Sequence, residues 1–140
     1  MRTNAYLREE LLKELRNVSA LILKENDIER KLYLFSAAYG VTSRTVRYNF
    51  DRELLLIDAI LNMTYNNLQG RLSSVKSGDR LVPLTSTTLD VLARCLSDIA
   101  DAIEKEESCY GLLQRLVTAT YITTGPGYYQ SLKGQISADD

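Results

Sequence analysis

The sequence predicts an all-α fold, a bundle of four to five helices that we expect to form a homodimer. Apolar residues recur at steps of three or four along most of the chain, the spacing that lines one face of a helix. Alternation typical of strands is confined to a few residues over 44–50. The 140 residues, 45% of them hydrophobic, fit one domain. We therefore expect a single helical domain over residues 1–127 and a loosely ordered tail over residues 128–140.

Three helices are expected in the first half of the chain. The first spans about residues 4–25, with an apolar stripe formed by Leu7, Leu11, Leu15, Val18 and Ile22. The second stripe consists of Ile28, Leu32, Phe35 and Tyr39. We expect this helix to end at Gly40, because glycine readily adopts the left-handed conformation that terminates helices. The third keeps helical spacing from Leu54 to Val75, with Asn49 or Asp51 as the candidate N-cap.

Two more helices are expected in the second half. One follows the threonine- and serine-rich segment 85–88, and its stripe consists of Leu89, Leu92, Leu96, Ile99 and Ile103. The other covers about residues 108–122 and is stopped by the loop Thr123–Gly127, in which Pro126 cannot continue a helix. The amides and hydroxyls of this loop could bind an anion or a peptide, although a simple helix terminator explains the same residues.

The apolar surfaces of the predicted helices are wider than one seam. Leu34, Leu55 and Leu56 lie outside the main stripes. A short bundle often buries such surplus against a second copy, which is the reason to expect a homodimer.

The composition limits the functional classes and the compartment. A net charge of −1 and a pI near 5.5 argue against a general polycation, although basic residues outnumber acidic ones over residues 28–80. Cys95 and Cys109 lie within or beside apolar patterns, and buried unpaired cysteines suggest a reducing compartment. The sequence shows no signal-peptide run and no membrane-spanning stretch. We therefore expect a cytoplasmic protein without a membrane partner.

Absent residue types and motifs argue against most enzyme classes. The chain has no histidine, which removes imidazole acid–base chemistry and histidine-ligated metals. It has no phosphate-binding glycine loop, and we expect no cofactor. We expect no catalytic residue. The remote candidates for metal ligands are Asp98, Asp101 and Glu104, which recur on one helix face and could hold a divalent metal for hydrolysis if a second helix supplied further acids.

The segment 40–50 carries the most specific pattern. Read as a helix-turn-helix, it places Gly40 in the turn, while Phe35 and Val41 point into the core. Hydroxyl and guanidinium groups would then line the side that faces a DNA groove. The residues concerned are Thr42, Ser43, Arg44, Arg47 and Tyr48.

Residues 32–56 resemble the helix-turn-helix of tetracycline-repressor-like regulators. The family pattern has Gly-Val-Ser, then Thr and an aliphatic residue, then Phe ten positions after the glycine. It is matched by Gly40, Val41, Thr42, Thr45, Val46 and Phe50. The resemblance implies a three-helix unit at about residues 5–60 that binds duplex DNA, followed by a dimerising, ligand-sensing part.

Taken together, these patterns favour a non-enzymatic interaction or assembly module that forms homo-oligomers. In that interpretation, residues 40–50 are a packed corner between helices. A DNA-binding regulator is the alternative, and a metal-dependent hydrolase is the remote one.

Overall fold

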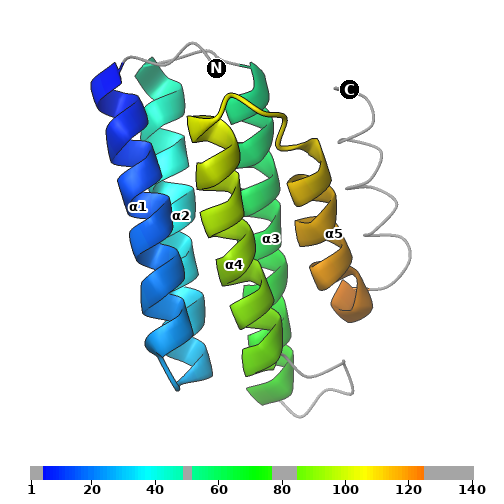
Figure 1. Cartoon of the computed structure of the whole chain (residues 1–140). Coiled ribbons are helices and arrows are strands. Elements are labelled where there is room, and N and C mark those ends of the chain that lie inside the picture. Colours follow the sequence, from blue (N-terminus) through cyan, green and yellow to red (C-terminus); the bar gives the residue numbers. More distant parts are fainter. Residues whose placement is uncertain (1–4, 49–51, 77–84, 125–140) are drawn as a thin grey trace.

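The computed structural model describes residues 5–48, 52–76 and 85–124, and the side chains within them except those of residues 48, 73–76 and 120–124. These ranges contain five helices and no strand, which confirms the predicted all-α bundle (Figure 1). The helices are α1 (Ala5–Lys24), α2 (Ile28–Tyr48), α3 (Arg52–Lys76), α4 (Ser86–Glu104) and α5 (Tyr110–Thr124).

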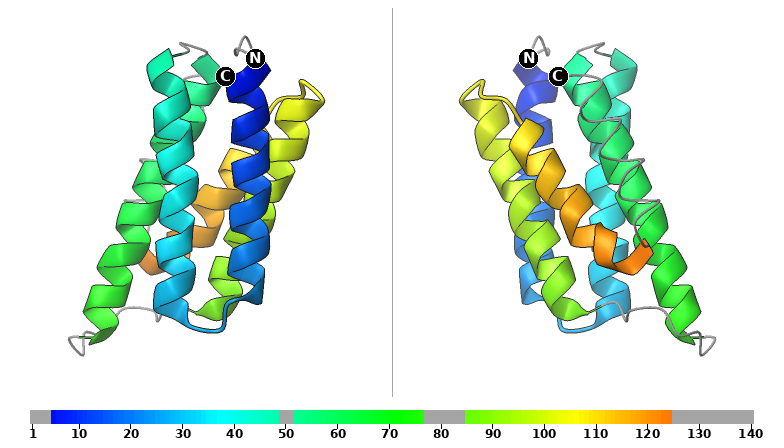
Figure 2. Two further views of the ribbon diagram at one scale, coloured as in Figure 1. Left: turned by 90° about the vertical axis from the view of Figure 1, so that its left-hand side faces the viewer. Right: turned by 90° about the vertical axis from the view of Figure 1, so that its right-hand side faces the viewer.

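The helices form a closed ring whose order differs from the order of the chain. Each helix runs opposite to the one before it (Figure 1). Going round the ring, α1 packs on α2, α2 on α3, α3 on α5, α5 on α4, and α4 on α1. The fifth helix therefore lies obliquely over α3 and α4 (Figure 2), while α2 and α4 meet across the interior.

The core is built from the predicted apolar stripes, which converge on the centre of the ring. Fully buried side chains come from all five helices and include Leu11, Leu15, Phe35, Ile57, Leu61, Leu92, Leu96 and Leu113. Burying a side chain of this size stabilises the fold by about 1.5–3 kcal/mol relative to leaving it exposed. The predicted periodicity therefore identified the correct buried face of each helix.

The second helix does not end at Gly40, and the prediction of a turn or corner there was wrong. α2 continues to Tyr48 without a break. A glycine inside a helix costs about 1 kcal/mol relative to alanine. Ala38 and Val41 are both buried and keep the apolar stripe continuous across Gly40. The free energy gained by burying them exceeds the cost of the glycine.

The other helix ends lie close to the predicted ones. Asn49 and Asp51, the candidate caps of α3, fall outside the described residues. α5 runs two residues beyond its expected end and includes Thr123 and Thr124, because the proline at 126 restricts only the residue directly before it.

Helix α4 has well-defined ends. Thr85 is its N-cap, and the Thr85 hydroxyl accepts a hydrogen bond from the Thr88 amide at 3.2 Å. At the other end, the Glu107 amide donates to the Ala102 carbonyl at 2.8 Å, and Glu106 has a positive φ of 58°. This is a Schellman motif with glutamate in the left-handed position where glycine is usual.

Candidate interaction surfaces

The residues predicted to contact DNA do not share one surface. Thr42 is buried and Ser43 is half-buried, whereas Arg44 and Arg47 are exposed on the last turns of α2. The side chain of Tyr48 lies outside the described residues. Only the two arginines therefore remain as a surface pair.

Thr42 is turned inward by a contact with the third helix. Its hydroxyl oxygen lies 2.8 Å from a carboxylate oxygen of Asp58 and 2.9 Å from the Tyr39 carbonyl. Burial raises the pKa of Asp58, and the hydrogen bond from Thr42 opposes that rise. The contact joins α2 to α3 and leaves Thr42 unable to reach a ligand at the surface.

The three carboxylates considered as metal ligands are ion-pair partners of arginines. Arg16 on α1 approaches Asp101 at 2.8 Å and Glu104 at 3.2 Å, and Arg115 on α5 approaches Asp98 at 3.4 Å. Within the described ranges, no group of three or more acidic or cysteine residues is placed to hold a metal ion. These acids therefore connect α4 to its two neighbours in the ring.

An inward-facing lysine was not predicted from the sequence. Lys31 on α2 is only 2% exposed and forms an ion pair with Asp90 on α4, across the interior of the ring. Its position four residues before Phe35 was the available signal, because residues four apart share one helix face. A buried ion pair adds little net stability, but it penalises any packing that separates its partners.

The third helix also buries polar groups. Thr64 is fully buried on α3, and its hydroxyl has no hydrogen-bond partner in the described part of the chain, nor has the side-chain oxygen of Asn67. Arg71, one further turn along, is also buried, and burial lowers its pKa to about 10. The guanidinium group therefore stays cationic at neutral pH.

The two cysteines are buried thiols, as expected. Burial raises the pKa of Cys109 to about 12, with the nearby carboxylate of Glu53 adding to the effect. Burial also raises the pKa of Cys95. Because the thiolate is the reactive form, both groups are poor nucleophiles in the folded chain.

Exposed apolar side chains occur on both helices near the turn that joins α1 to α2. Leu21 and Leu23, in the last turn of α1, are 42% and 40% exposed, and Tyr33, in the second turn of α2, is 74% exposed. Leu21 and Leu23 are two residues apart and lie on different sides of α1, so the three side chains surround this end of the hairpin. We call these three residues the hairpin face.

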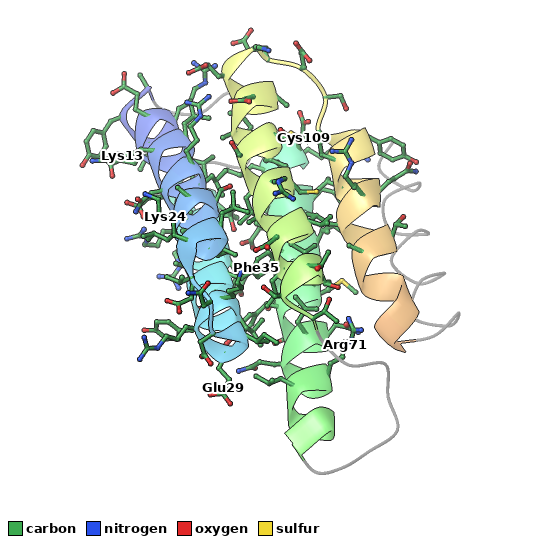
Figure 3. All side chains as sticks on the ribbon, turned by 60° about the horizontal axis from the view of Figure 1, so that its bottom comes forward. Lys13, Lys24, Glu29, Phe35, Arg71 and Cys109 are labelled. Atoms are coloured by element: carbon green, nitrogen blue, oxygen red, sulfur yellow. The ribbon has the colours of Figure 1, made fainter. Side chains whose placement is uncertain are left out.

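The charged residues beside the hairpin face are of both signs. Lys24 and Glu29 project outward from the ends of α1 and α2 (Figure 3). Asp27, Glu29 and Arg30 line an open hollow together with Tyr33. The surface around the hairpin face therefore has no single dominant charge.

Two further expectations meet the limits of the described residues. The first concerns the Thr123–Gly127 loop: the described residues do not include 125–127 or the side chains of Thr123 and Thr124. The second concerns the segment 128–140, which lies wholly outside the described residues. Among the helices that are described, none combines the length and the apolar character needed to cross a bilayer.

Comparison with known proteins adds no assignment. The chain matches no family model, no curated protein and no solved structure.

Proposed function

We propose that the chain is a non-enzymatic helical interaction module that assembles with a second copy of itself through the hairpin face. The observation that carries this proposal is the position of Leu21, Leu23 and Tyr33, three of the five large apolar side chains that are exposed in the described part of the chain. Exposed aliphatic and aromatic side chains at one end of a bundle, with charges around them, are typical of surfaces that bind another protein.

The mixed charges around the hairpin face favour a second copy as the partner. Lys24 and Arg30 carry positive charge within a few residues of Asp27 and Glu29. In an isologous dimer, each patch meets its own image, so a surface with both signs can complement itself. A partner of one dominant charge would meet repulsion from half of these groups.

A pair of charge-introducing variants tests the proposal. Leu21→Glu combined with Leu23→Glu places two carboxylates in the interface. We expect this variant to raise the dimer Kd by roughly 30- to 1,000-fold, because charging two apolar anchors at about 1–2 kcal/mol each costs about 2–4 kcal/mol in total. Sedimentation velocity over a range of protein concentrations measures the change.

Leu55→Glu provides the matched control. Leu55 is 41% exposed, like the two leucines of the hairpin face, but it lies in the first turn of α3 at the opposite end of the bundle (Figure 1). This variant should dimerise like the unmodified chain. The proposal is contradicted if both variants lose the dimer equally. It is also contradicted if the unmodified chain is monomeric at about 100 µM.

A second candidate, binding to nucleic-acid phosphates, is favoured by one observation. Arg44 and Arg47 are both exposed and lie three residues apart, so they project from neighbouring positions on α2. Their guanidinium groups suit phosphate oxygens. Because Thr42 is buried, such binding would depend on the DNA backbone more than on base edges.

Duplex DNA binding measured by fluorescence anisotropy tests this candidate. Arg44→Ala with Arg47→Ala should weaken binding strongly at about 50 mM salt and reduce the magnitude of the slope of log K against log salt concentration by about two. Lys13→Ala with Lys24→Ala removes the same charge from α1 and should have a smaller effect. Undetectable binding of the unmodified chain at this salt concentration rejects the candidate.

A further inference from the structure

The turn between α4 and α5 adopts a conformation that its own residues do not favour. Residues 105–109, Lys-Glu-Glu-Ser-Cys, contain neither glycine nor proline. Lysine and glutamate are good helix formers, so the local preference is to continue α4. Instead, the backbone of Glu106 has φ 58°, a left-handed conformation that is costly for a residue with a Cβ.

The described contacts that hold the fifth helix connect it to α3 and α4, which another copy of the chain could supply. α5 packs on α3 and α4, with Leu113 and Leu116 buried in the core. The Cys109 amide, just before α5, donates to the Glu53 carboxylate on α3 at 2.7 Å. Arg115 contacts Asp98 on α4. The contacts of Leu113, Leu116 and Arg115 do not depend on which chain α5 belongs to, whereas the Cys109 amide is free to reach Glu53 only while the turn at residues 105–109 is present.

We infer that two copies of the chain can exchange α5, with α4 and α5 of each chain joined into one continuous helix. In this exchanged dimer, α5 of one copy packs on α3 and α4 of the other. The partner is a second copy of this chain, because only α5 carries the buried residues that match this position.

The conformational cost of the turn favours the exchange, and the entropic cost of association opposes it. The side-chain contacts of α5 are reproduced in the dimer, so they do not change the balance. The hydrogen bond from the Cys109 amide to Glu53 is not reproduced, because in a continuous helix this amide donates to the carbonyl of Lys105, four residues earlier.

At residues 105–109, a continuous helix replaces the hydrogen bonds of the Schellman motif and of the Ser108 cap by intrahelical ones. It also relieves the left-handed conformation of Glu106 and follows the helix propensity of Lys105, Glu106 and Glu107. The cost is the loss of translational freedom of one chain, so the dimer increases with concentration.

This exchange uses a different part of the molecule from the hairpin face. The two modes of self-association therefore do not depend on each other, and a variant that abolishes one should leave the other intact. Dimer formation alone does not distinguish them, so the experiment must identify which chain provides α5.

Cross-linking of a mixture of ¹⁵N-labelled and unlabelled chains provides this identification. In the variant Arg115→Lys, a carbodiimide can join position 115 to Asp98, since both side chains of this pair are about half exposed. The two chains are unfolded and refolded together at high concentration, and the dimer and monomer fractions are then cross-linked. We expect cross-linked peptides of mixed isotopic composition in the dimer fraction only.

A second substitution gives the matched control. In Arg16→Lys, the same reagent can join position 16 to Asp101 or Glu104, which connects α1 to α4. Both helices stay in one chain during the exchange, so every cross-link should have a single isotopic composition. Leu21→Glu with Leu23→Glu should leave the mixed cross-links at position 115 unchanged, which separates this inference from the proposed function.

Two substitutions at Glu106 should change the exchanged dimer in opposite directions. Glu106→Gly removes the conformational cost of the turn and weakens the continuous helix, so the association constant should fall by roughly tenfold or more. Glu106→Ala favours the continuous helix and should raise it severalfold. Three results would overturn the inference. The first is that all cross-links at position 115 have a single isotopic composition. The second is a chain that stays monomeric after refolding at about 1 mM, and the third is equal dimer fractions in the two variants.

Discussion

At the scale of single residues, the contact between Thr42 and Asp58 depends on one proton. The Thr42 hydroxyl has one hydrogen but two acceptors within reach, the Tyr39 carbonyl and the Asp58 carboxylate. When Asp58 is protonated, it can donate to Thr42 while Thr42 donates to Tyr39, so both hydrogen bonds form. When Asp58 is ionised, only one of them forms.

The pH dependence of stability follows from this arrangement. Burial raises the pKa of Asp58 in the folded chain above its ordinary value of 3.8. The contribution of Asp58 to stability is therefore complete below pH 3.8 and is lost as the pH rises through the raised pKa.

Asp58→Asn mimics the neutral acid at every pH, because its amide can donate to Thr42. We expect this variant to be more stable than the unmodified chain at pH 7 by about 1 kcal/mol, the usual worth of one hydrogen bond. The difference should shrink as the pH falls toward 3.8. Urea unfolding between pH 4 and 8 measures it, and a variant that is less stable at pH 7 contradicts this account.

At the scale of helices, the sequence was sufficient to identify each element but not every boundary. Repeating apolar residues such as Leu89, Leu92 and Leu96 have a spacing that only a helix places on one face. The helix end predicted at Gly40 was wrong because that prediction used only the local conformational preference of glycine. Whether the helix continues depends on how well the following turn packs, and that is a property of the neighbouring helices.

Gly40→Ala separates a helix interior from a turn. An added Cβ at this position would meet no atom within 4 Å apart from its own helix and chain neighbours. We expect the substitution to stabilise the chain by about 0.5–1 kcal/mol, because alanine loses less conformational entropy than glycine in a helix. Thermal unfolding followed by circular dichroism measures the change. A loss of stability would indicate that Gly40 is needed for a turn.

At the scale of the whole molecule, the order of helices round the ring could not be predicted. Periodicity shows which face of a helix is buried, but not which helix covers it. The placement of α5 between α3 and α4 therefore had no signal in the stripes. Of the candidate surfaces, the surplus leucines suggested self-association, and Leu55 is indeed 41% exposed, but the exposure of Leu21, Leu23 and Tyr33 came only from the packing.

The pairing of α1 with α4 has a consequence for synthesis of the chain. Arg16 precedes its partner Asp101 by 85 residues. A ribosome that adds roughly 5–20 residues per second needs roughly 4–17 s to cover that interval. During this time α2 can cover only one side of α1, and the side that α4 later covers stays open to solvent. The nascent chain therefore offers a helix-length apolar surface to chaperones until α4 has emerged from the ribosome.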